Sequence, residues 1–448
     1  MSDHTPQFSL LRQRRFGPFF ATQFLGAAND NLFKFALTVL VTYQLQVAWL
    51  PPSVAGLVIG ALFILPFVLL SATAGQLADR MDKAVLMRRV KDCEILIMAA
   101  ALLGFVMQWP VLLLLCLVSM GVHSTFFGPA KFAYLPQVLK SSELTGGNGM
   151  VEMGTFVAIL LGNVVGGLLI ATPGVGRIHV GVACLALALA GRWFAHAIPH
   201  QAKPDVVQPM NWNPWTETMA NLRLARTDGV VFRAVLSISW MWFFGAVFLA
   251  EFPVLAKEVL DGNEQVAALL LVVFSLGVGT GALLCESLSR GRVEPGLVPL
   301  GAFGMTIFAV DLWWTLQAIP DSNAVLDLGA FLQAPDRWHV LLDLFGLSLS
   351  AGVYSVPLYA LIQQRSPVTH RARIIAANNI LNALFMVTSA LLAGMLLAAG
   401  LSVPELFLCM GLANAVFVAL VCWRDPHYLR RSKSWLLRIL GRWHTPSA

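Results

Sequence analysis

The chain is a succession of apolar runs, each about as long as a membrane-spanning helix. A transmembrane α-helix needs about twenty predominantly apolar residues to cross the hydrocarbon core of a bilayer. Short segments rich in proline, glycine or basic residues separate the runs. This pattern predicts an all-α membrane protein with twelve spans, at residues 16–45, 52–77, 90–107, 109–129, 147–171, 178–198, 229–256, 265–287, 296–316, 338–363, 375–400 and 404–423.

The composition excludes a soluble protein of this size. Hydrophobic residues make up 57% of the 448 residues and charged residues only 12%, against about 25% in soluble domains. So little polar side chain could not cover the surface of a soluble fold. The first run, 16–45, is too long for a signal-peptide core, and we expect it to remain in the mature protein as a span.

The basic residues predict which side of the membrane each loop faces. Of the 30 lysines and arginines, 24 are assigned to segments on the side of the N-terminus, with Lys91, at the start of span 3, counted in the loop before it, and only Arg177, Lys257 and Arg337 lie in the opposite loops. Because cytoplasmic loops carry the excess of lysine and arginine, both termini are predicted to be cytoplasmic. The same excess accounts for the isoelectric point near 9.1, which therefore indicates no nucleic-acid partner.

A proline-rich segment at residues 199–228 separates six predicted spans from the next six. It predicts an N-terminal bundle, 1–198, and a C-terminal bundle, 229–424, joined by a cytoplasmic linker. Within the linker, residues 215–226 have the pattern of a short helix on the membrane surface. The tail, 425–448, alternates basic and apolar residues, which predicts a basic amphipathic helix lying on anionic membrane lipid.

The two halves carry similar polar residues at equivalent places. Span 5 contains Asn148 and Glu152, and span 11, six spans later, contains Asn378 and Asn382 with the same spacing. Agreement of this kind, in the same order along both halves, predicts a parallel internal repeat. Each half is therefore expected to form one of two pseudo-symmetric six-helix bundles.

The loop after span 2 contains a motif in which Gly75, Asp79, Arg80 and Lys83 stand at fixed spacing. The glycine allows close helix packing, and the charged residues can cap or pair across a helix seam. The motif resembles the G-x-L-x-D-R-x-G-R-K signature of the major facilitator superfamily, with Asp82 where glycine is usual. That resemblance implies twelve helices working by alternating access, with Asp79 and Arg80 holding the inner ends of spans 2 and 11 as a gate.

Three further blocks, 23–31, 128–132 and 147–152, resemble the bacterial lysophospholipid transporter family, which includes the transporter halves of fused transporter–acyltransferase proteins. This narrower resemblance implies inward flipping of lysophospholipids such as lysophosphatidylethanolamine across the inner membrane. It implies no enzymatic activity and no cofactor in this chain, and a separate acyltransferase/acyl-carrier-protein synthetase as partner. In that family the aspartate of span 1 and the lysine of the Pro-Ala-Lys block handle the headgroup, which here means Asp30 and Lys131. Span 7 departs from the family pattern, because residues 243–251 contain no arginine where an inward-facing one is expected.

Polar residues inside spans are candidates for function, because a charge stranded in hydrocarbon is costly. On span 1, Gln23, Ala27, Asp30 and Lys34 share one helix face. Asp30 and Lys34 are four residues apart and could simply neutralise each other. The predicted substrate-binding residues are Asp30, Asn31, Lys34, Lys131, Asn148, Glu152, Asn378 and Asn382.

Other polar residues favour no further site. His123 is interpreted as a packing residue, Asp311 is predicted near a span end, and no cysteine or histidine spacing indicates a metal. His200 and Asp205 match the H-x-x-x-x-D pattern of acyltransferases by chance, since no companion motif follows. Two alternatives to lysophospholipid transport stay open: a proton-coupled transporter of another small amphiphile, with Asp30 or Glu152 as the proton site, and a non-transporting scaffold for an acyltransferase.

Overall fold

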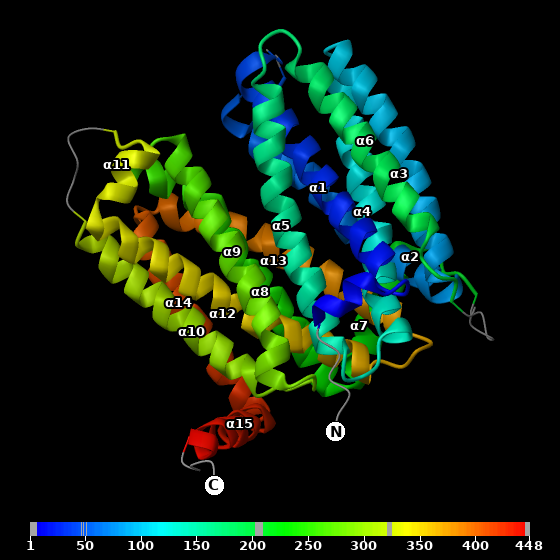
Figure 1. The fold of residues 1–448 in the computed structure, drawn as a ribbon, viewed down its shortest axis with the longest axis vertical. Coiled ribbons are helices and arrows are strands. Elements are labelled where there is room, and N and C mark those ends of the chain that lie inside the picture. Colours follow the sequence, from blue (N-terminus) through cyan, green and yellow to red (C-terminus); the bar gives the residue numbers. More distant parts are fainter. Residues whose placement is uncertain are drawn as a thin grey trace. The chain divides into compact units, whose positions relative to one another are not determined.

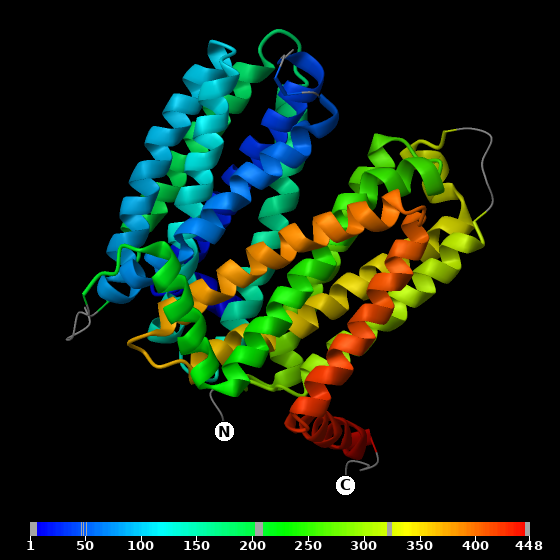
Figure 2. The same cartoon turned by 180° about the vertical axis from the view of Figure 1, so that it is seen from behind.

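The protein is helical throughout the part of the chain that the computed structural model describes, residues 7–45, 47, 49–50, 52–201, 209–319 and 325–443 (Figure 1). Figure 2 shows the same helices from behind. The predicted linker and tail extend over residues 202–208, including Asp205, and 444–448, which lie outside the described residues.

Eleven helical segments among the described residues are long and apolar enough to cross a membrane. They are α1 (Gly17–Val39, continued by the π-helical η2, Leu40–Gln44), α2 (Pro52–Arg80), α4 (Pro110–Val138), α5 (Leu144–Ile170), α6 (Gly176–His196), α8 (Gly229–Val254, continued by η3, Leu255–Val259), α9 (Glu264–Ser289), α10 (Leu297–Gln317), α12 (Pro335–Arg365), α13 (Arg371–Ala398) and α14 (Val403–Arg424). Shorter elements are η1 (Gln7–Arg12), α7 (Pro214–Thr227), α11 (Leu328–Gln333) and α15 (His427–Trp443).

The remaining long helix, α3 (Lys83–Val106), corresponds to the predicted third span but begins seven residues earlier. Asp82 starts it as the N-cap residue, because its side chain accepts a hydrogen bond from the backbone N–H of Ala84 at 2.8 Å. Its φ of −59° is ordinary for a non-glycine residue. Aspartate is therefore accommodated where the superfamily signature has glycine. Charged residues in its first half separate α3 from the eleven more apolar segments.

The predicted end of span 4 at residue 129 is wrong. Helix α4 continues to Val138, with Pro129 and Pro136 inside it. The prediction took the Gly-Pro pair as a helix end, but in membrane helices the backbone groups freed by proline can be satisfied by neighbouring groups. As a consequence Lys131 lies within α4 and not at its end.

The helices group into two compact units. The first contains the described residues of Met1–Lys140, Gly154–Val235 and Ile362–Leu384, and the second contains Ser141–Met153, Leu236–Leu361 and the described residues of Phe385–Ala448. Helices α5, α8, α12 and α13 therefore pass from one unit to the other. The predicted division into bundles before and after the 199–228 linker stays a prediction.

In the first unit α3, α4 and α6 run side by side around an apolar core (Figure 1). Phe33 of α1 meets Phe105 of α3 edge to face, with ring centroids 5.8 Å apart. The helices approach closely at glycines: a Cβ added at Gly121 of α4 would lie 2.5 Å from the carbonyl oxygen of Phe63 on α2. This is the small-residue packing by which membrane helices associate.

In the second unit α10 and α12 pack closely through glycine residues. A Cβ at Gly301 would lie 2.7 Å from the carbonyl oxygen of Ser350, and one at Gly346 would lie 2.5 Å from the ring of Phe308. These contacts hold the two helices close together where their side chains face each other across the seam.

The two shorter helices at predicted surfaces have exposed apolar side chains. In α7, which covers the short helix predicted at 215–226, Trp215 is 69% exposed although Glu217 and Asn221 are buried. In α15, the Trp435 indole N–H donates to the carbonyl of Leu288 at 2.8 Å, which anchors the basic tail helix to the second unit.

Candidate functional site

The first unit contains a buried ionic cluster formed by α1, α3 and α4. Its centre is Glu94 of α3, which is 0% exposed. Glu94 Oε1 accepts a hydrogen bond from Asn29 Nδ2 at 2.7 Å, and Oε2 accepts one from Lys91 Nζ at 2.5 Å. His123 Nε2 lies 3.1 Å from the same Oε2. We call these four residues the Glu94 cluster.

The surroundings of Lys91 are shaped to hold an ammonium group. Its Nζ lies 5.4 Å from the ring centroid of Phe127, at cation–π distance. A Cβ at Gly26 would lie only 2.5 Å from Nζ, and one at Gly191 would lie 3.6 Å from it. Glycines on α1 and α6 thus leave the space that the lysine head occupies. A buried charge is tolerated because it is paired and hydrogen-bonded.

Sequence reasoning missed the Glu94 cluster. It assigned Lys91 to the cytoplasmic loop, whereas the structure buries this lysine within α3. A signal was present, since Glu94 follows Lys91 by three residues and therefore shares its helix face. His123, interpreted from sequence as a packing residue, is buried against this carboxylate.

Asp30 forms a second polar pair beside the Glu94 cluster. Its Oδ2 accepts a hydrogen bond from Ser124 Oγ at 2.5 Å. Asp30 follows Asn29 on α1 and Ser124 follows His123 on α4, so the two pairs lie side by side. The other carboxylate oxygen, Oδ1, is buried and has no hydrogen-bond partner among the described residues. Asp30 therefore presents an acceptor that a ligand could use.

The other two predicted residues of α1 have different surroundings. Asn31 Nδ2 donates to the carbonyl of Ala27 in its own helix at 2.8 Å. Lys34 Nζ lies 4.9 Å from the ring centroid of Phe63 on α2. A pairing of Lys34 with Asp30 stays a prediction.

Lys131 lies half-buried between α1, α4 and α5. Its Nζ is 3.4 Å from both Gln23 Oε1 and Thr155 Oγ1. The Thr155 hydroxyl also donates to Gln23 Oε1 at 3.2 Å. The ammonium lies 4.9 Å from the ring centroid of Phe132. The Lys131 ammonium is therefore held by side-chain oxygens from α1 and α5, and an ammonium group can form charge-assisted hydrogen bonds with an anion.

The four residues of the predicted repeat are all buried. Asn148 and Glu152 belong to the second unit, whereas Asn378 and Asn382 belong to the first, together with Asp30 and Lys131. Asn148 Nδ2 donates to the carbonyl of Leu144 at 2.9 Å. Their role in substrate binding stays a prediction.

The α13 asparagine run lies against the Gly-Pro-Ala-Lys block of α4. A Cβ at Gly128 would lie 2.8 Å from Asn379 Nδ2, so only glycine fits here without displacing that side chain. The block at 128–132 and the asparagines of α13, which are far apart in the sequence, are therefore neighbours within the first unit.

Asp79, at the end of α2, caps the beginning of α13. Its Oδ1 accepts from the backbone N–H of Ala372 at 3.0 Å, and its Oδ2 accepts from that of Arg373 at 3.1 Å. A Cβ at Gly75 would lie 2.6 Å from the Ala376 side chain, so the glycine permits this approach. The predicted contact between the ends of spans 2 and 11 is present, and its role as a gate stays a prediction.

Helix α7 also contacts the beginning of α13, and the sequence did not predict this contact. Arg373 forms an ion pair with Glu217 at 2.6 Å and donates to Asn221 Oδ1 at 2.9 Å. Gln76 of α2 exchanges two hydrogen bonds with the backbone of Asn211, at 2.9 and 2.8 Å. The linker is therefore bound to both helices that the Asp79 cap joins.

The remaining two motif residues lie close by in the chain. Lys83, the first residue of α3, is buried, and Arg80, the last residue of α2, is half-buried.

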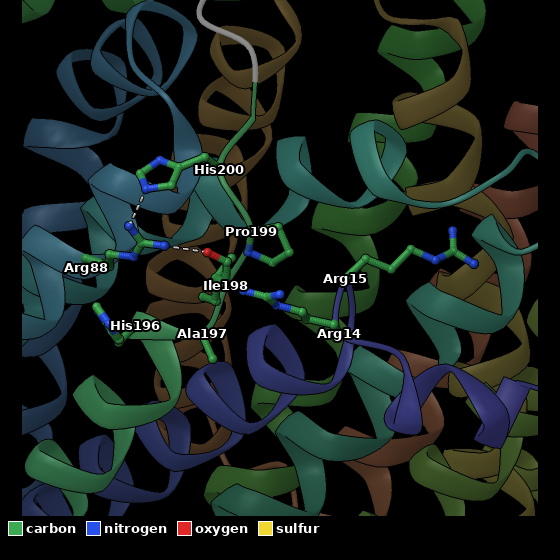
Figure 3. Close-up of a pocket in the computed structure, with 8 residues that line it drawn as sticks. All are labelled: Arg14, Arg15, Arg88, His196, Ala197, Ile198, Pro199 and His200. Atoms are coloured by element: carbon green, nitrogen blue, oxygen red, sulfur yellow. Dashed lines mark hydrogen bonds between the residues drawn. The ribbon is translucent and has the colours of Figure 1, made fainter.

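A surface cavity of about 570 Å³ in the first unit is lined by Arg14, Arg15, Arg88, His196, Ala197, Ile198, Pro199 and His200 (Figure 3). Arg88 donates to the carbonyl of Ile198 at 2.5 Å and lies 2.8 Å from His200 Nε2, while Arg15 points away from it. The arginines therefore do not converge on one ligand position, and none of the predicted substrate-binding residues lines this cavity.

Comparison with known sequences identifies relatives over most of the chain. Residues 19–332 match the family model described as the Major Facilitator Superfamily. The lysophospholipid transporter LplT of Enterobacter sp. (strain 638) is 24% identical over 361 residues, which cover 78% of this chain and 80% of the relative. The lysophospholipid transporter LplT of Escherichia fergusonii is 27% identical over 357 residues, covering 77% and 78%.

Comparison with solved structures gives the fold. The human organic anion transporter MFSD10 (TETRAN) matches with a TM-score of 0.69 at 13% identity, covering 90% of this chain and 99% of that one. The E. coli fucose:proton symporter FucP matches with a TM-score of 0.69 at 13% identity, covering 92% and 98%. Together with the helical spans and the family match, this makes the chain a multi-pass membrane transporter that belongs to the major facilitator superfamily.

Proposed function

We propose that this protein moves lysophospholipids, such as lysophosphatidylethanolamine, across the bacterial inner membrane by alternating access, with both termini in the cytoplasm. The similarity to relatives named lysophospholipid transporter LplT, at 24% and 27% identity, supports this substrate class. The observation that carries the proposal is Lys131, a lysine within the membrane-spanning helix α4 whose ammonium lies between Gln23 and Thr155.

Lys131 is suited to a phosphodiester. The lysine ammonium is a compact point charge with three donors, so it can meet phosphate oxygens from several directions. Gln23 and Thr155, each 3.4 Å from Nζ, can orient the ammonium group. The acyl chain of a lysophospholipid would lie on the apolar surface of the spans, which needs no specific contact.

Asp30 is suited to the cationic end of the headgroup. Its buried Oδ1 can accept a hydrogen bond from an ethanolamine ammonium, while Ser124 holds Oδ2. A lysophospholipid of this class carries both the anion that Lys131 would bind and the cation that Asp30 would bind. Asn148 and Glu152 remain our candidates for further headgroup contacts.

The test is a flipping assay in proteoliposomes with labelled lysophosphatidylethanolamine, comparing Lys131→Ala with Lys140→Ala. Loss of a charge-assisted hydrogen bond of about 1.5–3 kcal/mol should lower the apparent affinity of Lys131→Ala about ten- to hundredfold. Lys131→Arg should retain part of the affinity. Lys140, an exposed lysine just beyond α4, is the matched control and should leave transport unchanged.

Transport by Lys131→Ala within twofold of the unmodified protein, at equal abundance in the vesicles, would contradict the phosphate role. A defect of equal size in Lys140→Ala would contradict it as well, because it would show that general surface charge is responsible.

A proton-coupled transporter is the second candidate, favoured by the Asp30–Ser124 pair beside the buried Glu94 cluster. A carboxylate within a span is a common proton site in transporters. Under this alternative a pH gradient should drive net uptake, and Asp30→Asn should abolish that drive. Under the lipid proposal the flipping rate should not depend on the gradient. A separate acyltransferase/acyl-carrier-protein synthetase as partner stays a prediction.

A further inference from the structure

Three side chains that could ligate a metal ion meet in the second unit, and none of them belongs to the predicted substrate-binding or gate residues. Asp311 belongs to α10, and His339 and Asp343 belong to α12. His339 Nε2 lies 3.1 Å from Asp311 Oδ2 and 3.7 Å from Asp343 Oδ1. All three ligand atoms lie within 4.8 Å of one another. His339 and Asp343 are four residues apart on one helix, but the sequence does not pair them with Asp311, which lies 28 residues before His339.

The charge balance of this trio is unfavourable without a further cation. Asp343 is 1% exposed and lies within a membrane span. Among the described residues, His339 is the one basic side chain that forms an ion pair with either carboxylate. With both carboxylates ionised, even a charged imidazole would leave one negative charge uncompensated, which is costly at such a place unless a proton or a metal ion binds between them.

We propose that Asp311, His339 and Asp343 bind one divalent transition-metal ion of the zinc class. Two ligands at ~2.0–2.2 Å from a tetrahedral zinc ion are roughly 3.3 Å apart. The distances of 3.1 and 3.7 Å from the imidazole to the two carboxylates lie on either side of that value. Three protein ligands leave a fourth position open for water.

The ligands are held in place before an ion binds. All three are on helices, and the glycine contacts of Gly301 and Gly346 fix α10 against α12. Thr315 Oγ1 donates to Asp343 Oδ2 at 3.1 Å, which leaves Oδ1 directed towards His339. A hydrogen bond of this kind to a ligating carboxylate orients it for the metal.

The site also has an entry side. The side chain of Asp343 is only 2% exposed, but those of His339 and Asp311 are 54% and 45% exposed. Both exposed ligands are close to helix ends: His339 is four residues beyond the start of α12, and Asp311 is six residues before the end of α10. The trio is therefore open at the surface of the second unit and not enclosed in its apolar core.

The ligand chemistry selects among divalent ions. One imidazole with two carboxylates suits zinc or manganese, and affinity should follow the order Mg²⁺ < Mn²⁺ < Zn²⁺. Calcium prefers six to eight oxygen ligands, which this site does not offer. The occupied site would join α10 to α12 and stabilise the second unit.

The test is titration of the full-length protein, purified without a polyhistidine tag and treated with chelator, with Zn²⁺, Mn²⁺ and Mg²⁺ separately in a calorimeter. We expect saturable binding of about one Zn²⁺ per chain and a rise in Tm with Zn²⁺. His339→Ala should weaken zinc binding about a hundredfold or more, since it removes one of three ligands. Thr315→Val should weaken it about tenfold. The control is His179→Ala, which removes an exposed histidine of α6 and should change nothing.

X-ray absorption spectroscopy at the zinc edge gives a second measurement that needs no variant. We expect nitrogen and oxygen ligands at about 2.0–2.1 Å from the zinc ion. Absence of saturable Zn²⁺ binding would overturn the proposal and leave the trio as a protonated, hydrogen-bonded cluster. Binding that His339→Ala leaves unchanged would overturn it too, because the ion would then be held elsewhere.

Discussion

At the scale of single residues, Glu94 stabilises three partners at once. Its two oxygens serve Asn29 and Lys91, and His123 lies 3.1 Å from one of them. In such a cluster the members depend on each other, because a buried polar group costs most when its partner is removed. The cluster therefore behaves as one structural group on three helices.

Glu94→Gln should destabilise the protein much more than Asp92→Asn on the same helix. Glutamine keeps the size of the side chain but leaves the Lys91 ammonium without its counter-charge, which should cost about 3–5 kcal/mol. Asp92 pairs with Arg192 at a site where the two side chains are 53% and 29% exposed, and its replacement should cost at most about 1 kcal/mol. Unfolding of both variants in mixed micelles measures the difference. If both substitutions lower the stability by the same small amount, the Lys91 ammonium must be hydrated in Glu94→Gln, and the prediction is wrong.

Single residues were predictable where the sequence isolates them. Asp30 stands out because it is the one carboxylate in the first apolar run, 16–45. Glu94 does not stand out, because Arg88, Arg89 and Lys91 just before it suggest a loop. Its burial follows from partners on α1 and α4, and no local pattern encodes those partners. The same holds for Asp343, whose neighbour Asp311 is on another helix.

At the scale of elements, the carboxylate of Asp79 on α2 accepts hydrogen bonds from two backbone N–H groups in the first turn of α13. The first N–H groups of a helix have no partner within it, and the helix dipole favours a negative charge there. Two hydrogen bonds to one carboxylate make this contact, so a single substitution at Asp79 is expected to weaken it.

Asp79→Asn should shift the population towards the state open to the cytoplasm, with folding intact. Asparagine keeps one acceptor oxygen of the two and loses the charge at the start of α13, which should change the ratio of states about two- to fivefold. Cysteine accessibility from each side of the membrane measures that ratio. The control is Asp82→Asn, which alters a cap within α3 and should leave the ratio unchanged. If Asp79→Asn leaves the ratio of states unchanged, the assignment of Asp79 to a gate is wrong.

Helix existence was predictable from apolar runs, whereas helix ends were not. The prediction 16–45 corresponds to α1 with η2, and 404–423 corresponds to α14 within one residue at each end. Helix α4 runs nine residues past its predicted end, because Pro129 does not stop a helix that neighbours support. The first turns of α3 are polar, so the start of this helix could not be located from the apolar run that follows it.

At the scale of the whole molecule, the topology depends on α3. Eleven apolar segments alone would place the two termini on opposite sides of the membrane, and α3 as the twelfth span places them on the same side. The positive-inside distribution predicts the second arrangement. The 24-residue length of α3 is sufficient to cross the bilayer.

In a cysteine-free background, Met107→Cys and Met81→Cys, which flank α3, should react with an impermeant maleimide from opposite sides. Met107→Cys should be labelled in intact cells, and Met81→Cys only after the cells are permeabilised. Both residues are at least partly exposed. Labelling of both from one side would mean that α3 does not cross the membrane.

The buried charges of α3 also bear on how the chain is made. A translocon releases a helix into lipid according to its hydrophobicity, and each charge near the middle opposes release by about 2.5–3.5 kcal/mol. With Lys91 and Glu94 in its length, α3 cannot leave the channel alone. Asn29 of α1 must already be in place, and His123 of α4 must emerge before the pair is satisfied. Substitutions at those two positions should therefore show themselves as poor insertion and proteolytic loss of the nascent protein before any step of transport is affected.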